Sequence, residues 1–474
     1  MKRMLSLILI ACMMLALVAC GSSQSSAPAE TQPKDTRFRV GYARANITPS
    51  SPVGLTCYGN TSERIHKTVL DYLYLTCVAI TDAEDNTIIL MSIDLTGMAN
   101  VAANSVRAEV SDATGVPKEN ITISGTHTHS GPDFGSVSTH VNKIVGDLAL
   151  EAIADQSYAD MYIGDSNTVN LNFVRHYVMD DGSVVGDNHG DPTGKEYTGH
   201  VSEADSQLQL IQFKREDGKK DVIMANWQAH ASITGGSTKY DMSADFVGAF
   251  RDCMEKELDC QFVYYQGAAG NLNATSRIGG ECANTTNPKN YRVHGELLTG
   301  HAKEALADMT LLDPGLIKVH TEDYIAECQH ADGELVNYAS LVIAYYQQGH
   351  TAAETQIYAM QYGIASYYHA VAISNRGGLG ATDNIPITTI QMGNVGLATI
   401  PGELFDTCGM YIKENSPYDM TFVMGYCNGA VSYLPTAEAY EYGCYEADIG
   451  KFVPGTAEAL AERHVELLNE LSGK

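Results

Sequence analysis

Basic residues are scarce in this sequence: 30 lysines and arginines stand against 57 aspartates and glutamates, which gives a formal net charge of −27. Without Lys2 and Arg3, which belong to a leader segment, 28 basic residues remain and the charge becomes −29. A nucleic-acid-binding domain needs basic side chains to neutralise phosphates, so we exclude nucleic acid as a partner. The acidic residues are spread along the chain without a long run, which is typical of a solvated surface.

The sequence also lacks any C-x-x-C pair, although it contains 11 cysteines. Cys12 lies in the leader and Cys20 directly follows it, and the nine that remain, an odd number, indicate neither a thiolate zinc site nor a complete disulfide framework. Cys253 and Cys260 are close enough in sequence to pair, as are Cys427 and Cys444. Buried free thiols explain these cysteines equally well.

Long apolar runs are absent apart from residues 5–19, which follow the positively charged start Met1-Lys2-Arg3. This run is short for a membrane span and has the form of an export signal, residues 1–19. The stretch Leu17-Val18-Ala19-Cys20-Gly21 resembles a bacterial lipobox, which predicts a lipid on Cys20 and attachment to a membrane at the cell surface or its periplasmic face. Ordinary cleavage with an unmodified Cys20 is the alternative. The Ser-, Ala-, Pro- and Gln-rich segment 20–36 would form the anchor and a flexible linker.

Residues 37–474 contain no linker-like stretch, repeat or charge block, so we expect one large domain there. Strand and helix patterns are mixed along it, which predicts an α/β fold with a mixed β-sheet or sheets and flanking helices. Strands are expected at 38–45, 72–80, 87–94, 121–124, 159–163, 207–213, 222–227, 262–266, 387–392, 396–400 and 421–424. Helices are expected near 99–113, 136–155, 243–258, 291–309, 351–370, 403–414 and 455–472.

The motif Gly-Thr-His-Thr-His-Ser-Gly-Pro at 125–132 places two imidazoles one residue apart, directly after the apolar run 121–123. If that run is a buried strand, the alternation of side chains sends His127 and His129 to the same side at the strand's end, where the active sites of α/β proteins form. Two imidazoles at such a place indicate a metal site. The alternative is a pair of hydrogen-bonded turn histidines.

Four further polar residues stand beside predicted strands. Asp94 ends the strand 87–94, where its carboxylate would either orient a histidine or cap the next helix. His230 follows the strand 222–227, and Tyr433 lies in a loop after another apolar strand. Glu403 opens the predicted helix 403–414, where the helix dipole favours a carboxylate in the first turn. Taken singly, each of these residues has an ordinary structural explanation.

Together, and in this order, these segments resemble the neutral (non-lysosomal) ceramidase family. The resemblance runs from about residue 39 to 472, and it rests on 40–49, the histidine motif, Asn226-Trp227 with His230, Ile400-Pro401-Gly402-Glu403 and Ser432-Tyr433. The Gly-Thr and Ser-Gly-Pro residues that flank the two histidines make that motif quite specific, whereas the other segments persuade by their order.

Matched residue by residue, the resemblance implies a mononuclear zinc site whose ligands are His127, His230, Glu403 and Tyr433. Two imidazoles and a carboxylate are ordinary zinc donors, and the charge of the metal would stabilise the unusual phenolate by lowering the pKa of the tyrosine. His129 would contact the substrate or the oxyanion beside the metal. Arg175 would hold a carbonyl or anionic group by paired hydrogen bonds; a surface ion pair is the alternative for it.

The catalytic serine of the family is missing from this chain. In the family it stands in a Gly-Asp-Val-Ser-Pro-Asn segment, and the best match pairs Gly270 with that glycine and Asn273 with the serine. An amide cannot act as the nucleophile, but it can donate a hydrogen bond to an oxyanion or a water. Ser276 would substitute only if the loop were shifted. The family members with ceramidase activity carry a further C-terminal domain, for which we expect no counterpart after the helix that ends near 472.

We therefore expect a zinc-dependent hydrolase that cleaves an amide (N-acyl) or related acyl bond with a zinc-activated water. It would act on a small molecule or a lipid, and a ceramide-like lipid is one candidate. His129, Arg175 and Asn273 would position the substrate. The alternative is a catalytically retired surface lipoprotein that binds a solute or a lipid on the same fold. The stretch 377–380, Gly-Gly-Leu-Gly, is not a phosphate-binding fingerprint, and we expect a flexible loop there near the substrate entrance.

Overall fold

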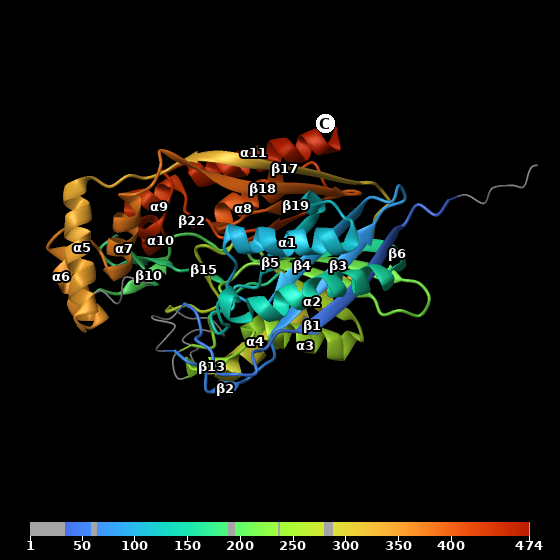
Figure 1. Ribbon diagram of the computed structural model, residues 1–474, viewed down its shortest axis with the longest axis horizontal. Helices are drawn as coiled ribbons and strands as arrows, with labels where there is room; N and C mark the ends of the chain where they lie inside the picture. Colours follow the sequence, from blue (N-terminus) through green and yellow to red (C-terminus); the bar gives the residue numbers. More distant parts are fainter. Residues whose placement is uncertain (1–33, 58–63, 188–194, 236–237, 279–287, 474) are drawn as a thin grey trace, which may run out of the picture. The chain divides into compact units, whose positions relative to one another are not determined.

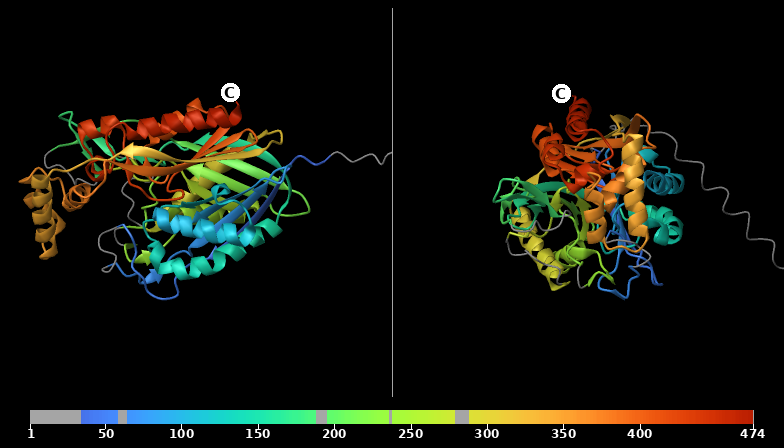
Figure 2. Two further views of the ribbon diagram at one scale, coloured as in Figure 1. Left: turned by 45° about the horizontal axis from the view of Figure 1, so that its top comes forward. Right: turned by 90° about the vertical axis from the view of Figure 1, so that its left-hand side faces the viewer.

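Two β-sheets face each other across a shared apolar core (Figures 1 and 2). The computed structural model describes residues 34–57, 64–187, 195–235, 238–278 and 288–473, so the leader, the lipobox and Cys20 lie outside the described residues. The larger sheet has the order β14-β12-β11-β6-β1-β3-β4-β5, with β16 added to β6. The smaller sheet has the order β17-β18-β19-β21. Both sheets mix parallel with antiparallel pairs, as the mixed α/β prediction requires.

The strands of the larger sheet are β1 (Phe38–Asn46), β3 (Tyr74–Thr81), β4 (Thr87–Ile93), β5 (Ile121–Gly125), β6 (Ser157–Asn167), β11 (Gln207–Arg215), β12 (Val222–Trp227), β14 (Gln261–Gln266) and β16 (Thr310–Leu311). Those of the smaller sheet are β17 (Ile317–Glu327), β18 (Thr382–Met392), β19 (Val395–Thr399) and β21 (Met420–Met424). Every strand predicted from the sequence is present, with ends that shift by a few residues. The sequence patterns did not predict β17.

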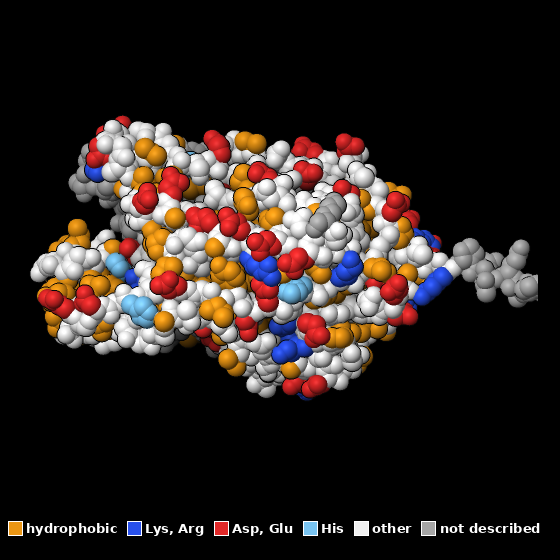
Figure 3. Space-filling model, turned by 90° about the horizontal axis from the view of Figure 1, so that it is seen from above, with side chains coloured by type: hydrophobic (Ala, Val, Ile, Leu, Met, Phe, Trp, Pro, Cys, Tyr) orange, Lys and Arg blue, Asp and Glu red, His pale blue; other side chains and the backbone are white. Residues whose placement is uncertain are grey.

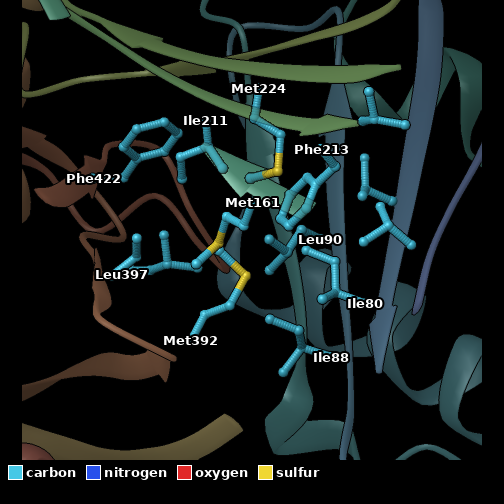
Figure 4. Packing of buried hydrophobic residues seen from close by; sticks show 14 of the residues in the cluster. Ile80, Ile88, Leu90, Met161, Ile211, Phe213, Met224, Met392, Leu397 and Phe422 are labelled. Carbon is cyan, nitrogen blue, oxygen red and sulfur yellow. The ribbon is translucent and has the colours of Figure 1, made fainter. Parts of the chain in front are cut away.

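The core between the sheets is built by alternation along the strands. In β4, Ile88 and Leu90 point into the space between the sheets, whereas Ile89 and Met91 point to the helices on the outer face. Figure 4 shows Leu90 and Phe213 of the larger sheet packed close to Met392 and other side chains of the smaller one. Burial of such side chains, at roughly 25 cal/mol per Å² of apolar surface, is the main force that holds the two sheets together.

Helices cover both outer faces, which gives four layers (Figure 2). On the larger sheet, α1 (Asn100–Thr114) and α2 (Phe134–Ala154) pack over one half, and α3 (Asp245–Leu258) and α4 (Pro288–Ala307) pack over the other. On the smaller sheet lie α8 (Asp406–Asn415) and α11 (Thr456–Ser472). The predicted helix 351–370 is wrong as a single helix: it is divided into α6 (Ala352–Met360) and α7 (Tyr367–Arg376), with Gly363 at φ 72° between them.

Helices α5 (Gly333–Gln347), α6 and α7 have a small apolar core of their own and lie beyond the ends of the strands (Figure 1). The remaining elements are short: β2 (Thr68–Val69), β7 (Phe173–Val174), β8 (His176–Met179), β9 (Val184–Gly186), β10 (Tyr197–His200), β13 (Asp241–Met242), β15 (Leu272–Asn273), β20 (Glu403–Leu404), β22 (Tyr433–Leu434), α9 (Ala437–Tyr442) and α10 (Tyr445–Ile449). Several of these short elements hold the side chains of the candidate site.

Two other expectations are resolved by the fold. Cys253, Cys260, Cys427 and Cys444 are all free thiols, so neither proposed pair forms a disulfide. Asp94 takes neither predicted role, because its carboxylate accepts a hydrogen bond from the Tyr74 backbone and pairs with Arg251 at 2.9 Å.

No helix among the described residues is both long and apolar enough to cross a bilayer. Acidic side chains are scattered over the face drawn in Figure 3 without forming one block.

The topology brings together the carboxyl ends of three parallel strand pairs. β4 runs parallel to β5, β12 to β14 and β19 to β21, and the chain leaves each pair toward a residue singled out in the sequence. His127 follows β5, His230 follows β12, and Glu403 follows β19. The two sheets also touch at these strand ends, where the Gly425 backbone N–H donates to the Gln266 carbonyl and that of Gly125 donates to the Tyr426 carbonyl.

Candidate metal centre

His127 and His230 present the same ring atom to a common point. The Nδ1 of His127 lies 2.7 Å from the carbonyl oxygen of Thr96, and the Nδ1 of His230 lies 2.9 Å from that of Ala269. A carbonyl can only accept, so each Nδ1 carries the proton and each Nε2 keeps its lone pair. Burial lowers the pKa of His127 and that of His230, in each case to about 3, so both rings are neutral at physiological pH. Two neutral imidazoles with inward lone pairs are suitable metal ligands.

His127 reaches this position through a backbone turn. It has a φ of 60°, in the left-handed region that residues other than glycine rarely adopt. The chain beyond β5 is therefore not a continued strand, and strand alternation is the wrong reason for the convergence of His127 and His129. The convergence itself is present: the two Nε2 atoms lie 3.1 Å apart. The ring of His129 also lies 5.3 Å from that of His230, measured between centroids.

Glu403 and Tyr433 are direct partners in a parallel pair of two-residue strands, β20 and β22. The prediction that Glu403 opens a helix is wrong, because α8 begins only at Asp406. The Glu403 backbone N–H donates to the Ser432 carbonyl, so its direction is set by sheet pairing and not by a helical first turn. Gly270 packs against the Glu403 backbone so closely that a Cβ would collide with the Glu403 carbonyl. Only glycine fits there.

The carboxylate of Glu403 faces the two histidines. Its Oε2 lies 3.2 Å from the Nε2 of His230 and 3.8 Å from the Nε2 of His127. This oxygen is buried, and among the described residues it has no hydrogen-bond partner. A buried carboxylate oxygen against two imidazole lone pairs is costly unless a cation lies between them. The donor types are those that zinc prefers, so the residues fit a divalent metal.

Tyr433 borders the same group through Arg175. The Nη2 of Arg175 donates to the Tyr433 hydroxyl at 3.2 Å, and its Nη1 lies 3.2 Å from the Nε2 of His230. Burial raises the pKa of Tyr433 well above its ordinary value, and Glu403 raises it further. Arg175 opposes this increase without cancelling it, so the phenol is protonated in this arrangement, and a bound cation would favour its ionisation further. Arg175 is buried at the site, so the alternative of a surface ion pair is wrong.

His129 lies as close to His127 and His230 as a metal ligand would, although the sequence comparison gave it only a substrate contact. The ring nitrogens of His127, His129 and His230 form a group within 4.8 Å of one another, which is itself a possible three-histidine metal site. Burial lowers the pKa of His129 well below its ordinary value, and the neighbouring His127 lowers it further. The position of His129 suits both a metal ligand and a substrate contact.

Asn273 lies beside the histidines through backbone contacts. It belongs to β15, pairs with Phe173 of β7, and forms an isolated parallel bridge with His230. Its side-chain Nδ2 donates to the Oδ2 of Asp187 at 2.6 Å, so one of its two N–H groups is engaged. Ser276 does not take its place: the Ser276 hydroxyl bonds the Nε2 of His200 at 3.0 Å and accepts from the Ile278 backbone.

Three residues at the centre were missed from the sequence. The Tyr426 hydroxyl lies 2.9 Å from the Nε2 of His127, and its ring stacks on that histidine at 3.8 Å between centroids. Its position just after β21 repeats the strand-end signal that marked His127 and His230, and could have been used. Glu446 and His176 form a buried group with Arg175. Nothing in the sequence near Glu446 distinguishes it from the other acidic residues.

A cavity of about 590 Å³ lies close to Tyr433, although none of the candidate metal ligands lines it. Its lining includes Ser432 and Tyr445, and the Tyr445 ring lies 6.0 Å from that of Tyr433. Gly378 and Leu379 of the predicted flexible loop also line it, together with residues of α7. The cavity gives space for an apolar group near Tyr433.

The four-layer fold is that of the neutral ceramidases, whose solved structures superpose on nearly the whole chain. One is neutral ceramidase from Pseudomonas aeruginosa, with a TM-score of 0.70 and 18% identity over 93% of this chain and 75% of that one. Another is a ceramidase complexed with C2, with a TM-score of 0.69 and 16% identity over 93% of this chain and 76% of that one. No protein-family model matches the chain. At these identities the likeness establishes the fold.

Proposed function

We propose that this protein is a zinc-dependent hydrolase of the neutral ceramidase type, which cleaves an amide (N-acyl) or related acyl bond. The observation that carries the proposal is the buried, unpartnered Oε2 of Glu403, which faces the Nε2 atoms of His230 and His127. The fold shared with neutral ceramidases supports the same class of chemistry. Tyr433, the register partner of Glu403, would complete the ligand set.

Bound zinc would supply a Lewis acid that polarises the scissile carbonyl and lowers the pKa of a water at the site. The residues of the chain would hold and orient the ligands. His127 and His230 keep their Nε2 lone pairs directed inward because the Thr96 and Ala269 carbonyls hold their Nδ1 protons. Glu403 would contribute a negative charge that offsets part of the charge of a bound metal.

The substrate would be held by Arg175, His129 and Asn273. The Arg175 guanidinium is fixed by the Gly270 carbonyl and the Tyr433 hydroxyl, so its direction at the site is set before a substrate enters. Asn273 has one amide N–H outside its bond to Asp187 and can donate it to the oxygen that becomes negative during acyl transfer. In this route the water is the nucleophile and no serine is needed, so hydrolysis is compatible with asparagine at position 273.

The substrate would be a small molecule or lipid whose scissile bond lies at the histidines and whose remaining part fills the adjoining cavity. Tyr445, Tyr368 and several aliphatic side chains line this space, which suits an apolar group. Ceramide is one candidate. We further propose that Cys20 carries a lipid and holds the enzyme at the outer surface or periplasmic face of a bacterial membrane, where N-acyl lipids are accessible.

The test of this function is turnover by zinc-loaded protein of ceramide, of simpler N-acyl amides and of esters, in parallel with Asn273→Ser. We expect wild-type protein to hydrolyse at least one amide or ester of the panel. Gain of ceramide cleavage in Asn273→Ser would assign the difference from ceramidases to the missing serine, and no gain would assign it to the shape of the cavity. A panel left intact by zinc-loaded protein would contradict the proposal.

A retired binding protein is the second candidate, favoured by one observation. The Asn273 amide is tied to Asp187, as expected if this position now has a structural task. Under this alternative a ligand would raise the melting temperature while every member of the substrate panel stayed intact. The same panel, read by thermal shift as well as by turnover, therefore separates the two candidates.

A further inference from the structure

A chain of four buried or half-buried polar side chains runs inward to the candidate metal centre. The Tyr442 hydroxyl lies 2.8 Å from the Nδ1 of His176, and the Nε2 of His176 lies 2.9 Å from the Oε2 of Glu446. The Oε1 of Glu446 accepts from the Nε of Arg175 at 2.6 Å and lies 2.5 Å from its Nη2. Arg175 then contacts His230. Glu446 thus joins His176 to the guanidinium that borders the histidines.

The contacts of His176 fix one of its protons. The Glu446 carboxylate can only accept, so the Nε2 of His176 carries a proton, and its Nδ1 forms a hydrogen bond with the Tyr442 hydroxyl. Burial alone would raise the pKa of Glu446, but Arg175 and then His176 outweigh it and hold that pKa below its ordinary value. The Arg175–Glu446 pair is ionised although their side chains are only 6% and 1% exposed.

The same residues do not form a second metal site. His176, Cys444 and Glu446 have ligand atoms within 4.8 Å of one another, a spacing that would suit a cation. Both carboxylate oxygens of Glu446 are already engaged, however, one by the Arg175 guanidinium and one by the His176 N–H. A cation in this group would lie next to the positive charge of Arg175, and it would have to displace two hydrogen bonds.

Glu446 instead balances the positive charge of Arg175. The Nη1 of Arg175 lies 3.2 Å from the Nε2 of His230, so a positive charge stands beside a proposed zinc ligand. Without a counter-charge it would repel a divalent cation. Glu446 neutralises that charge from the side away from His230, and with Glu403 the group retains one net negative charge for the metal to meet.

We propose that Glu446 is a positioning and charge-balancing residue, which makes zinc binding compatible with a substrate-binding arginine 3.2 Å from a zinc ligand. This inference rests on the proposed zinc-dependent function. His176, fixed by Tyr442, orients the Glu446 carboxylate so that its other oxygen faces Arg175. Groups that support metal ligands in this way commonly change metal affinity by about 10- to 100-fold when they are removed.

The experiment measures zinc affinity by chelator competition for wild-type protein, Glu446→Gln, and Arg175→Met with Glu446→Gln. Glutamine keeps the shape of glutamate but leaves the guanidinium unbalanced, so we expect Glu446→Gln to bind zinc about 10- to 100-fold more weakly. The double variant removes both charges and should recover zinc affinity to near that of wild type, while its turnover stays low because the substrate contact of Arg175 is lost. Glu438→Gln, an exposed glutamate of the neighbouring helix α9, is the control and should bind zinc as wild type does.

Two results overturn the inference alone: wild-type zinc affinity in Glu446→Gln, or a double variant that binds zinc no better than Glu446→Gln. If Glu446→Gln does not fold, the double variant carries the test, because replacing both partners of a buried ion pair is far less costly than removing one. A folded double variant without zinc would then contradict the inference. Wild-type protein that binds no zinc would contradict the proposed function, and this inference with it.

Discussion

Glu403 and Tyr433 lie side by side as register partners of β20 and β22, although 30 positions separate them in the sequence. The Glu403 N–H donates to the Ser432 carbonyl, so a backbone hydrogen bond couples the carboxylate to the phenol. A metal ligand set needs donors held at fixed separations, and sheet pairing provides this without any loop having to adjust. The arrangement gives the carboxylate and the phenol one common scaffold.

Replacing Glu403 by glutamine should abolish tight zinc binding. The amide has the size of the carboxylate but no charge, so the affinity should fall by at least about 100-fold, the upper end of what losing a supporting group costs. Competition with a chromogenic chelator measures this. Glu414→Gln, an equal change at an exposed position of α8, should leave the affinity unchanged. Equal zinc binding by Glu403→Gln and Glu414→Gln would remove Glu403 from the ligand set.

Substitution of the two motif histidines separates their roles. His127→Ala should lose stoichiometric zinc, because its Nε2 faces Glu403. His129→Ala should retain zinc and lose about 10²- to 10³-fold in turnover, the usual cost of removing a donor to the developing oxyanion. Metal analysis of both proteins after dialysis against buffered zinc is the measurement. If His129→Ala also loses its zinc, the group of three histidines would be the ligand set.

The substitution Gly270→Ala should displace Glu403 by pushing on its backbone. Its Cβ would collide with the Glu403 carbonyl, and the Gly270 N–H now donates to the Leu404 carbonyl at 2.8 Å. Displacement of β20 should lower both the melting temperature and the zinc affinity, the latter by about tenfold or more. Gly300→Ala in α4, where a Cβ meets no other atom, is the matched control and should stabilise the helix by about 1 kcal/mol. Unchanged zinc affinity in Gly270→Ala would show that β20 can move without affecting the metal.

The free energy of unfolding should decrease as the pH is lowered, because His294, away from the candidate metal centre, is buried in its neutral form. His294 lies against the rings of Trp227 and Phe246, and burial lowers its pKa to about 3, whereas an unfolded histidine titrates near about 6.5. Between these values the unfolded chain binds the additional proton. The contribution of His294 is therefore complete above about pH 6.5 and is lost as the pH falls toward 3, at about 1.4 kcal/mol per pH unit.

The variant His294→Leu isolates this effect. Urea unfolding at pH 7 and at pH 5 should show a smaller loss of stability on acidification than in wild-type protein, by about 2 kcal/mol over the interval from 6.5 to 5. The same pH dependence in both proteins would mean that His294 is not the source. Both measurements are made on protein without added metal, so that zinc release does not contribute.

The strands and the first two histidines were predictable because their signals are local. The apolar runs before His127 and His230 are strands, and the side chains that follow them meet beyond the carboxyl ends of these strands. The position of Glu403 was mistaken because a carboxylate before an apolar helix reads as a first-turn residue, whereas its partner β22 lies far along the chain. Strand β17 was missed because most of its side chains are at least partly exposed and give no apolar run.

The network behind Arg175 could not be read from the sequence. Glu446 lies 271 positions from Arg175, and no periodicity connects the two. Only the packing of α10 against the loop after β7 brings them together. The resemblance to ceramidases indicated Arg175 itself, but not the buried carboxylate that balances its charge.

Zinc content is the most direct test of the central claim that the residues around Glu403 hold a catalytic metal. Purified protein is stripped with a chelator, reconstituted with zinc, freed of excess metal and assayed for zinc together with hydrolysis of the amide and ester panel. We expect one zinc per chain and hydrolysis that is lost on chelation and restored in proportion to the zinc that returns. Protein that takes up no stoichiometric zinc, or that hydrolyses its substrate equally well without it, would contradict the claim.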